Sequence, residues 1–266
     1  MSMVNISVEI PLTWGKHLKE QLEALRNQKY QDFEISVASS MPSGSYEDML
    51  KDYGANITYC GPNILEKRYY AHKISRGEYS LLLDETRIPH SDLLMKLQSL
   101  SNDMVVIEER DMGSSFWIRM ANIDKINSLN CNDISATGGF VLPRYFRFGL
   151  LTEAFERVRS HLDEKVFMSV LMEDHQLIYY EASKLSSSLD ILRGDYLFHY
   201  GDERLISILR KYHRYGRKHR ILKNTAYEEI LRPTNRLRNI CSGSRIGLFI
   251  FYLARGIPFL VGYYLI

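Results

Sequence analysis

Residues 77–89 read GEYSLLLDETRIP, a short apolar run that ends in two adjacent carboxylates. A continuous apolar run of this length, bounded by turn residues, is typical of a strand buried on both faces of a sheet. Asp84 and Glu85 follow the run directly, and open α/β sheets bind ligands beyond the carboxyl ends of their strands. Two hard oxygen donors at such a place predict a site for Mg²⁺ or Mn²⁺ beside a substrate's phosphates. The alternative is that both acids begin a loop and cap a helix that starts near Ser91.

Strand and helix patterns alternate four times within the first hundred residues. The strand patterns lie at residues 4–10, 33–37, 56–59 and 80–83, and the helix patterns at 18–25, 46–53, 64–75 and 91–100. This alternation predicts a parallel sheet with right-handed crossovers, so the expected fold class is α/β.

The rhythm changes after residue 101. Residues 104–108 and 116–120 are expected to be strands, added to the sheet in antiparallel fashion. Gly138 and Gly139 predict a turn or a close approach of the backbone. Further patterns predict helices at residues 150–161 and 164–172 and a short strand at 177–180.

The net charge of +2 conceals an asymmetry along the chain. Residues 193–245 hold 13 Lys and Arg against 5 Asp and Glu, and much of this charge lies in a basic helix expected at 203–222. A basic tail on an acidic body predicts an anionic partner, either a membrane or a nucleic acid.

Residues 246–266 read IGLFIFYLARGIPFLVGYYLI, with Arg255 as the only charge. A helix of this length just spans the hydrocarbon core of a bilayer. Arg255, Gly256 and Pro258 near its middle favour a re-entrant hairpin or an interfacial anchor over a simple span, and a buried helical hairpin is the alternative. The preceding basic residues favour the cytoplasmic face of the cell membrane. Nucleic acid is not expected as the partner, because it would leave the apolar end unexplained.

The three cysteines, Cys60, Cys131 and Cys241, are far apart, odd in number and without metal-ligand spacing. They predict a reducing compartment and no disulfide framework. The first residues lack the basic and apolar regions of a signal peptide, so the body is expected in the cytosol.

Several short segments form a recognisable series when they are taken in order: residues 8–11 (VEIP), 22–37 (LEALRNQKYQDFEISV), 67–68 (KR), 77–79 (GEY), 83–84 (LD), 163–167 (DEKVF), 179–182 (YYEA) and 212–217 (YHRYGR). This series resembles the inverting family-2 glycosyltransferases of GT-A fold, in their membrane-associated form. The resemblance covers roughly residues 4–220 and implies a GT-A nucleotide-binding domain.

The resemblance also implies roles for individual residues. Asp84 and Glu85 would hold Mg²⁺ or Mn²⁺, and Glu164, or else Asp163, would be the catalytic base. The nucleotide sugar would be bound by Pro11, Thr13, Ser39, Ser40, Lys67, Arg68 and Asp84.

The chain departs from the family pattern at three places. Ala38-Ser39-Ser40 stands where an acidic pair usually contacts the nucleotide base, and the second aspartate of the DxD motif is either replaced by Thr86 or shifted to Glu85. Asp163-Glu164 reverses the usual Glu-Asp order.

The implied function is transfer of a hexose, with inversion, from a nucleotide sugar to a lipid-linked or surface-glycan acceptor. The expected organisation is a catalytic domain at residues 1–192, a basic helical region at 193–245 and a hydrophobic membrane segment at 246–266. An alternative, motivated by the departures, is a catalytically inactive subunit that binds sugar nucleotides in a glycan-assembly complex. A nucleotidyltransferase is ranked lower, because only Gly15 follows the first strand where a Gly-rich phosphate loop is expected.

Overall fold

The computed structural model describes residues 4–42, 44, 46–137, 141–171, 173–231 and 239–265. Within these residues, eight strands form one sheet in the order β3-β2-β1-β4-β7-β6-β8-β5. The strands are β1 (Ile6–Leu12), β2 (Phe33–Ser39), β3 (Asn56–Tyr59), β4 (Tyr79–Leu82), β5 (Arg87–Pro89), β6 (Met104–Asp111), β7 (Tyr145–Arg147) and β8 (Leu189–His199). The first four pair in parallel, which confirms the parallel sheet predicted for the first hundred residues.

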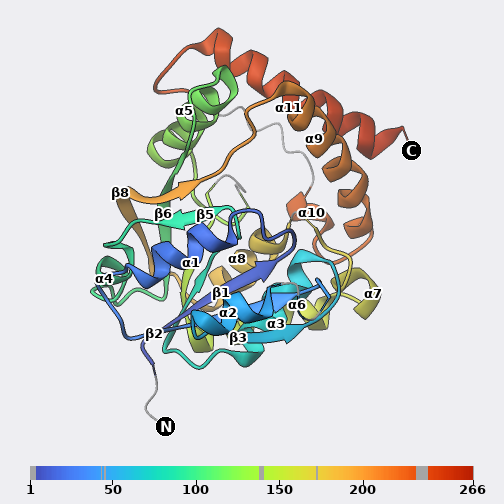
Figure 1. Cartoon of the computed structure of the whole chain (residues 1–266). Coiled ribbons are helices and arrows are strands. Elements are labelled where there is room, and N and C mark those ends of the chain that lie inside the picture. Colours follow the sequence, from blue (N-terminus) through green and yellow to red (C-terminus); the bar gives the residue numbers. More distant parts are fainter. Residues whose placement is uncertain are drawn as a thin grey trace.

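Helices cover both faces of the sheet (Figure 1). One core contains α1 (Leu18–Arg26), α2 (Glu47–Asp52) and α4 (Leu93–Leu97), and a second contains α3 (Ile64–Ile74), α6 (Phe148–His161) and α8 (Asp174–Leu185). In β4, Leu81 belongs to the first core and its neighbour Leu82 to the second, and both side chains are fully buried. The apolar run of this strand is therefore buried on both faces, as its sequence predicts.

The second half of the sheet is mixed. Strand β7 is antiparallel to β4 and β6, and β8 is parallel to β6. The sequence predicted β6 but not β8, whose residues LDILRGDYLFH lack a clean alternation and are interrupted by Gly194. The domain boundary expected after residue 192 falls inside this strand.

Two predicted strands are wrong, because both segments lie within helices. Residues 116–120 open α5 (Phe116–Cys131), where the Ser115 hydroxyl caps the helix by accepting a hydrogen bond from Ile118 N at 3.2 Å. Residues 177–180 lie inside α8, whose buried residues Leu177, Ile178 and Ala182 follow helical spacing. In both places a window of four or five residues, rich in large apolar side chains, was too short to separate strand from helix.

The helix predicted at 164–172 is shorter in the structure. Helix α7 (Glu164–Phe167) has only four residues and a turn follows it. The predicted turn at Gly138 and Gly139 lies outside the described residues.

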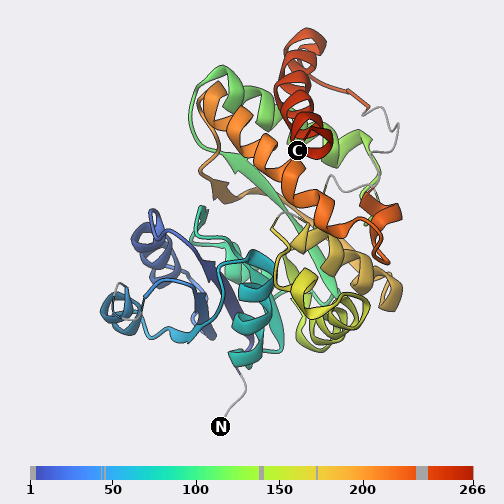
Figure 2. The ribbon, with the colours of Figure 1, turned by 90° about the vertical axis from the view of Figure 1, so that its right-hand side faces the viewer.

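The last helices gather at one end of the molecule, with α5 beside them (Figures 1 and 2). The predicted basic helix is confirmed as α9 (Leu205–His219), which is followed by the short helices η1 (Arg220–Leu222) and α10 (Glu228–Leu231). Helix α11 (Arg245–Tyr264) packs along α9 and against α5. The expected hairpin is wrong, because α11 is continuous and contains Pro258 within it.

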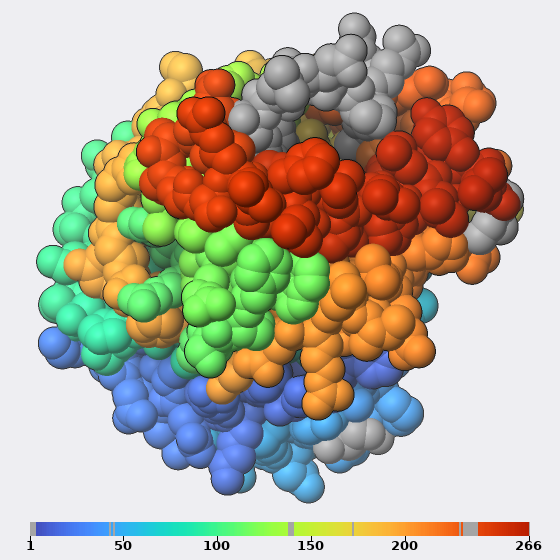
Figure 3. Space-filling model, turned by 90° about the horizontal axis from the view of Figure 1, so that it is seen from above, coloured from blue at the N-terminus to red at the C-terminus, as the bar shows by residue number. Residues whose placement is uncertain are grey.

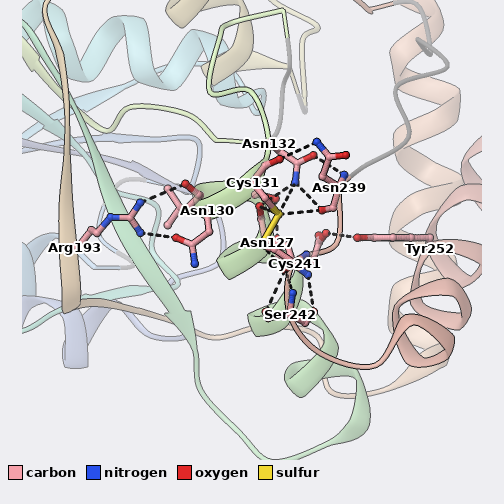
Figure 4. The surroundings of a disulfide bond; sticks show 12 residues. Asn127, Asn130, Cys131, Asn132, Arg193, Asn239, Cys241, Ser242 and Tyr252 are labelled. Carbon is pink, nitrogen blue, oxygen red and sulfur yellow. Dashed lines mark hydrogen bonds between the residues drawn. A yellow bond between two sulfur atoms is a disulfide. The ribbon is translucent and has the colours of Figure 1, made fainter.

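A disulfide joins Cys131, at the end of α5, to Cys241, before α11 (Figure 4). Around it, the Asn127 side chain accepts hydrogen bonds from the backbone N–H groups of Cys241 and Ser242 at 3.1 and 2.8 Å. Asn132 and Asn239 are also bonded to each other, at 2.9 Å. The expectation of no disulfide is wrong, because packing brings together two cysteines separated by 110 positions in the chain.

Candidate active site

The candidate site lies where the parallel strands β1, β2 and β4 end. Leu12 at the end of β1 is in register with Ser39 at the end of β2, and β4 runs parallel to β1 on its other side. The residues that follow β1 and β4 therefore lie at one edge of the sheet. This is the edge at which open α/β sheets bind ligands.

Glu85 holds the loop that follows β1. Its carboxylate accepts hydrogen bonds from the backbone N–H groups of Thr13, Trp14 and Gly15 at 2.9 to 3.0 Å. Both carboxylate oxygens are engaged in this way, and the residue is only 7% exposed. Glu85 is thus a structural anchor for the loop, which differs from the predicted role as a metal ligand.

Lys67 of α3 reaches the same loop and donates a hydrogen bond to the Thr13 hydroxyl at 2.8 Å. Its side chain is fully buried, and this burial lowers the pKa of its ammonium group. The structure thus brings Thr13, Lys67 and Glu85 together in the loop that follows β1.

The remaining residues predicted to bind the nucleotide sugar lie at the same edge. Pro11 is part of β1, in register with Ala38, and Ser39 is almost fully buried. The Ser39 hydroxyl accepts a hydrogen bond from Met41 N at 3.0 Å, while Ser40 beside it is partly exposed.

Asp84 is surrounded by three guanidinium groups. It forms ion pairs with Arg68 of α3 and Arg87 of β5, and Arg144 Nη1 lies 3.7 Å from its Oδ2. Burial by itself would raise the pKa of Asp84, but the three arginines outweigh it and hold that pKa well below its usual range. The Asp84 carboxyl group is therefore an ionised carboxylate that is paired with arginine side chains.

The charged network continues from Asp84 toward β6. Arg87 and Arg144 share the carboxylate of Glu109, which Arg87 contacts through Nε at 2.9 Å. Lys125 of α5 approaches the same carboxylate at 3.6 Å. These four side chains line a cavity of about 200 Å³, with apolar side chains from β6 and α5 making up other parts of its wall.

Three consecutive residues at the start of α8 connect this network to the rest of the fold. Glu173 is bonded to His219 of α9, Asp174 to Arg68, and His175 Nε2 lies 3.3 Å from Arg144 Nη1. Arg68 therefore bridges two carboxylates, those of Asp84 and Asp174.

Burial shifts the pKa values of two of these residues in different senses. Burial raises the pKa of the Asp174 carboxyl above its usual value, although Arg68 opposes the shift. Burial, together with the charges of Arg68 and Arg144, lowers the pKa of His175 well below its usual value, so its imidazole is neutral. A carboxylate with a raised pKa is suited to accept a proton near neutral pH.

Three buried polar atoms in this network have no hydrogen-bond partner among the residues that the structure describes: Arg68 Nη1, Glu173 Oε2 and His175 Nδ1. Buried polar groups are normally paired, since an unpaired one costs free energy. Their presence here, beside Asp84 and Asp174, is typical of a site that completes its hydrogen bonds with a ligand or water.

The two residues predicted as the catalytic base, Asp163 and Glu164, are not part of this charged network. Both residues are exposed at the start of α7, and the Asp163 carboxylate caps this helix by accepting a hydrogen bond from Val166 N at 2.9 Å. Among the hydrogen bonds and ion pairs of the described residues, none joins either acid to Asp84 or its arginines.

Sequence reasoning missed Arg87, Glu109, Arg144 and the acidic pair of α8. One signal was available: Glu173-Asp174 has the Glu-Asp order of the family, whereas Asp163-Glu164 reverses it. The roles of Arg87, Glu109 and Arg144 carry no such signal, because they depend on strands β5 to β8 coming together.

A divalent cation does not fit these residues as they are placed. Both carboxylate oxygens of Glu85 accept hydrogen bonds from backbone amides, and Asp84 is paired with arginines. Thr86 has a hydroxyl at the position where the family usually has a second carboxylate. Within the described part of the chain, no cluster of three or more His, Cys, Asp or Glu side chains is arranged to hold a metal ion.

Solved structures show that the fold is the GT-A glycosyltransferase fold. The mannosyltransferase PcManGT from Pyrobaculum calidifontis, in complex with GDP-Man and Mn²⁺, matches 98% of this chain and 74% of its own, with a TM-score of 0.57 at 12% identity. Residues 1–349 of TarS from S. aureus match 95% of this chain and 72% of their own, with a TM-score of 0.54 at 15% identity. The same TarS fragment in complex with UDP also matches with a TM-score of 0.54.

No protein-family model matches the sequence, and no curated protein matches it either. At these identities the structural likeness establishes the fold, while the chemistry must be argued from the site.

Proposed function

We propose that this protein is a glycosyltransferase that moves a hexose from a nucleotide sugar to an acceptor hydroxyl with inversion. One observation carries the proposal: Arg68 holds two carboxylates, Asp84 and Asp174, side by side at the ligand-binding edge of a GT-A sheet. The solved relatives that bind GDP-Man and UDP support a nucleoside diphosphate as the donor's leaving group.

Asp174 is the base in this proposal, in place of Glu164 or Asp163. The acceptor hydroxyl gives its proton to the Asp174 carboxylate while its oxygen attacks the anomeric carbon, and the bond from that carbon to the phosphate oxygen breaks. The raised pKa of Asp174 suits this proton transfer. Arg68 positions the carboxylate, and neutral His175 lies next to it in the chain.

The donor lies along the ends of β1 and β2 in this scheme. Thr13 and the partly exposed Ser40 offer polar groups to the nucleotide, and Pro11 and Ser39 shape the wall behind them. Lys67 fixes the Thr13 side chain by donating a hydrogen bond to its hydroxyl.

Replacing the proposed base tests the function. We expect Asp174→Asn to lower kcat for nucleotide release from UDP- or GDP-sugars by about 10²- to 10⁴-fold, since a positioned general base contributes about that much. Glu164→Gln is the matched control and should keep near-normal turnover. Calorimetric titration of the nucleotide should show that Asp174→Asn still binds, which separates a chemical defect from a folding defect.

The opposite pattern, with Glu164→Gln inactive and Asp174→Asn active, would return the base to α7. If no nucleotide sugar is turned over although nucleotide binds, the inactive binding subunit becomes the better description.

We further propose that the acceptor is lipid-linked or part of a surface glycan and that the protein meets it at a membrane. Helix α11 is long and apolar enough to cross a bilayer, but it is held along α9 and α5 by its inner face. Arg255 and Tyr252 bond to Asp124 of α5 at 3.1 and 2.8 Å. A helix tied to the body in this way is better suited to lie in the membrane surface, with its outer face in the lipid.

The cytoplasmic face of the cell membrane stays a prediction. The positive charge of α9 favours it. The Cys131–Cys241 bond weighs against it, since disulfides are rare in reducing compartments.

A further inference from the structure

The residues after β4 place a guanidinium group against the first of their two carboxylates. The chain reads Asp84-Glu85-Thr86-Arg87, so a hydroxyl and then a cation follow the two acids. Arg87 turns back onto Asp84 and pairs with its Oδ2, while Arg68 pairs with Oδ1. The side chain that usually attracts a divalent cation is thus already neutralised by protein cations.

A divalent cation at Asp84 would meet strong repulsion. Arg68, Arg87 and Arg144 all lie against this one carboxylate, and their guanidinium groups stay charged at any ordinary pH. The cation would have to displace two of these pairs, and the neighbouring carboxylates are already engaged: Glu85 with the amides of the β1 loop, and Asp174 and Glu109 with arginines.

The same arginines can stabilise the negative charge of a diphosphate, which is the role that a metal ion would otherwise have. Arg87 uses Nε and one N–H of each terminal nitrogen for Asp84 and Glu109, which leaves one N–H on each terminal nitrogen. The Nη1 atom of Arg68 is buried and has no hydrogen-bond partner within the described part of the chain. Guanidinium groups bind phosphate oxygens through two parallel hydrogen bonds, so these free donors match a diphosphate.

Arg87 and Arg144 also border a space beside the charged network. Both side chains line the cavity of about 200 Å³ together with Lys125 and Glu109. Their charges are already paired, Arg87 with Asp84 and Glu109, and Lys125 with Asp111, so a phosphate group there would bind through the remaining arginine N–H groups.

We propose that Arg87 and Arg144, with Arg68, neutralise the leaving diphosphate, so that donor binding and transfer need no divalent metal. The inference rests on the proposed glycosyl transfer. In that reaction the electron pair of the breaking carbon–oxygen bond goes to the nucleoside diphosphate, and the acceptor's proton goes to Asp174. The arginines accept neither; they stabilise the charge that develops on the β-phosphate.

The test compares nucleotide binding with and without metal. UDP and GDP are titrated calorimetrically into the full-length protein in EDTA, and again in Mg²⁺ or Mn²⁺. We expect the better nucleotide to bind with the same Kd, within about twofold, in both buffers. Arg87→Gln should weaken binding in EDTA by roughly ten- to a hundredfold, the loss expected for a charged hydrogen bond.

Arg110→Gln is the matched control. Arg110 is an arginine of β6 that pairs with exposed Asp195. It should leave the Kd unchanged. A second variant, Thr86→Asp, adds the missing carboxylate and should make binding weaker in EDTA and dependent on Mn²⁺.

The outcomes separate the inference from the function. Binding and sugar transfer that vanish in EDTA and return with Mn²⁺ would overturn the inference and leave the glycosyltransferase intact. Metal-free nucleotide binding that depends on Arg87, without transfer from any sugar donor, would support the inference and overturn the function. No nucleotide binding in either buffer would overturn both.

Discussion

Asp84 and Glu85 are adjacent acids with opposite surroundings. Asp84 faces three guanidinium groups, whereas Glu85 faces three backbone amides at the end of β1. A carboxylate that accepts several backbone N–H groups replaces the hydrogen bonds that those amides would otherwise make with water. Glu85 therefore couples the loop after β1 to the loop after β4.

Replacing Glu85 should destabilise the protein. In Glu85→Gln the charge is lost and the new amide group turns a donor toward N–H donors. We expect the free energy of unfolding to fall by about 1–3 kcal/mol, the cost of leaving buried donors unsatisfied. Urea denaturation followed by circular dichroism measures it.

Glu23→Gln is the matched control on exposed α1 surface, where its carboxylate only approaches Lys19 at 3.9 Å. Its effect should stay within about 0.5 kcal/mol. Equal stability of the two variants would show that Glu85 does not anchor the loop.

Helices α9 and α11 touch through glycines. A Cβ atom on Gly216 of α9 would lie 2.0 Å from the Phe259 carbonyl oxygen, and one on Gly262 of α11 would lie 2.1 Å from the His213 carbonyl oxygen. These atoms belong to the backbone, so neither can move aside cheaply. The two glycines therefore set how closely the helices approach.

A methyl group at this contact should separate the helices. We expect Gly216→Ala to lower the free energy of unfolding by about 1–3 kcal/mol through overpacking. Thermal unfolding, together with protease cleavage in the segment before α11, measures the effect.

Gly256→Ala is the matched control on α11, since a Cβ there meets no atom within 4 Å. Alanine is a better helix former, so this variant should be neutral or stabilised by up to about 1 kcal/mol. Identical losses in both variants would contradict the close contact.

At the scale of the whole molecule, one end carries an exposed apolar surface. It is the outer face of α11, which lies across this end above α5 and α9 (Figure 3). Exposed side chains recur along it at helical spacing: Ile246, Phe249, Ile250, Leu253, Ile257, Leu260, Val261 and Tyr264. An apolar stripe of this kind, beside a basic helix, is typical of proteins that bind the surface of an anionic membrane.

The membrane proposal predicts co-sedimentation with vesicles that contain phosphatidylglycerol. Binding should weaken as salt is raised, because the lysines and arginines of α9 contribute through screened charge. Ile257→Gln, at a side chain that is 55% exposed, should weaken binding by roughly tenfold or more, as expected for removing one buried aliphatic side chain from lipid.

Met95→Gln is the control, because Met95 is an exposed apolar residue on α4. It should bind vesicles like the unmodified protein. If the full-length protein does not bind vesicles of this composition at low salt, the membrane proposal is wrong and α11 binds another partner.

The sequence by itself determined the parallel half of the sheet and the position of the basic helix. These features are local, since apolar periodicity and turn residues fix where each element begins and which side it buries. It also placed Thr13 and Asp84 at one edge, because the residues after parallel strands must meet there. Lys67 and Arg68, which lie on a helix, were assigned to this edge by the family resemblance.

Only the tertiary structure decided four other features. These are the pairing of Asp84 with arginines, the hydrogen bonds of Glu85 to the β1 loop, the contact of Asp174 with Arg68 and the disulfide between Cys131 and Cys241. Each joins residues from elements far apart in the chain, and one chain pattern is compatible with many such pairings. Burial then set the chemistry, since a carboxylate binds metal, caps amides or accepts a proton according to the charges that packing places around it.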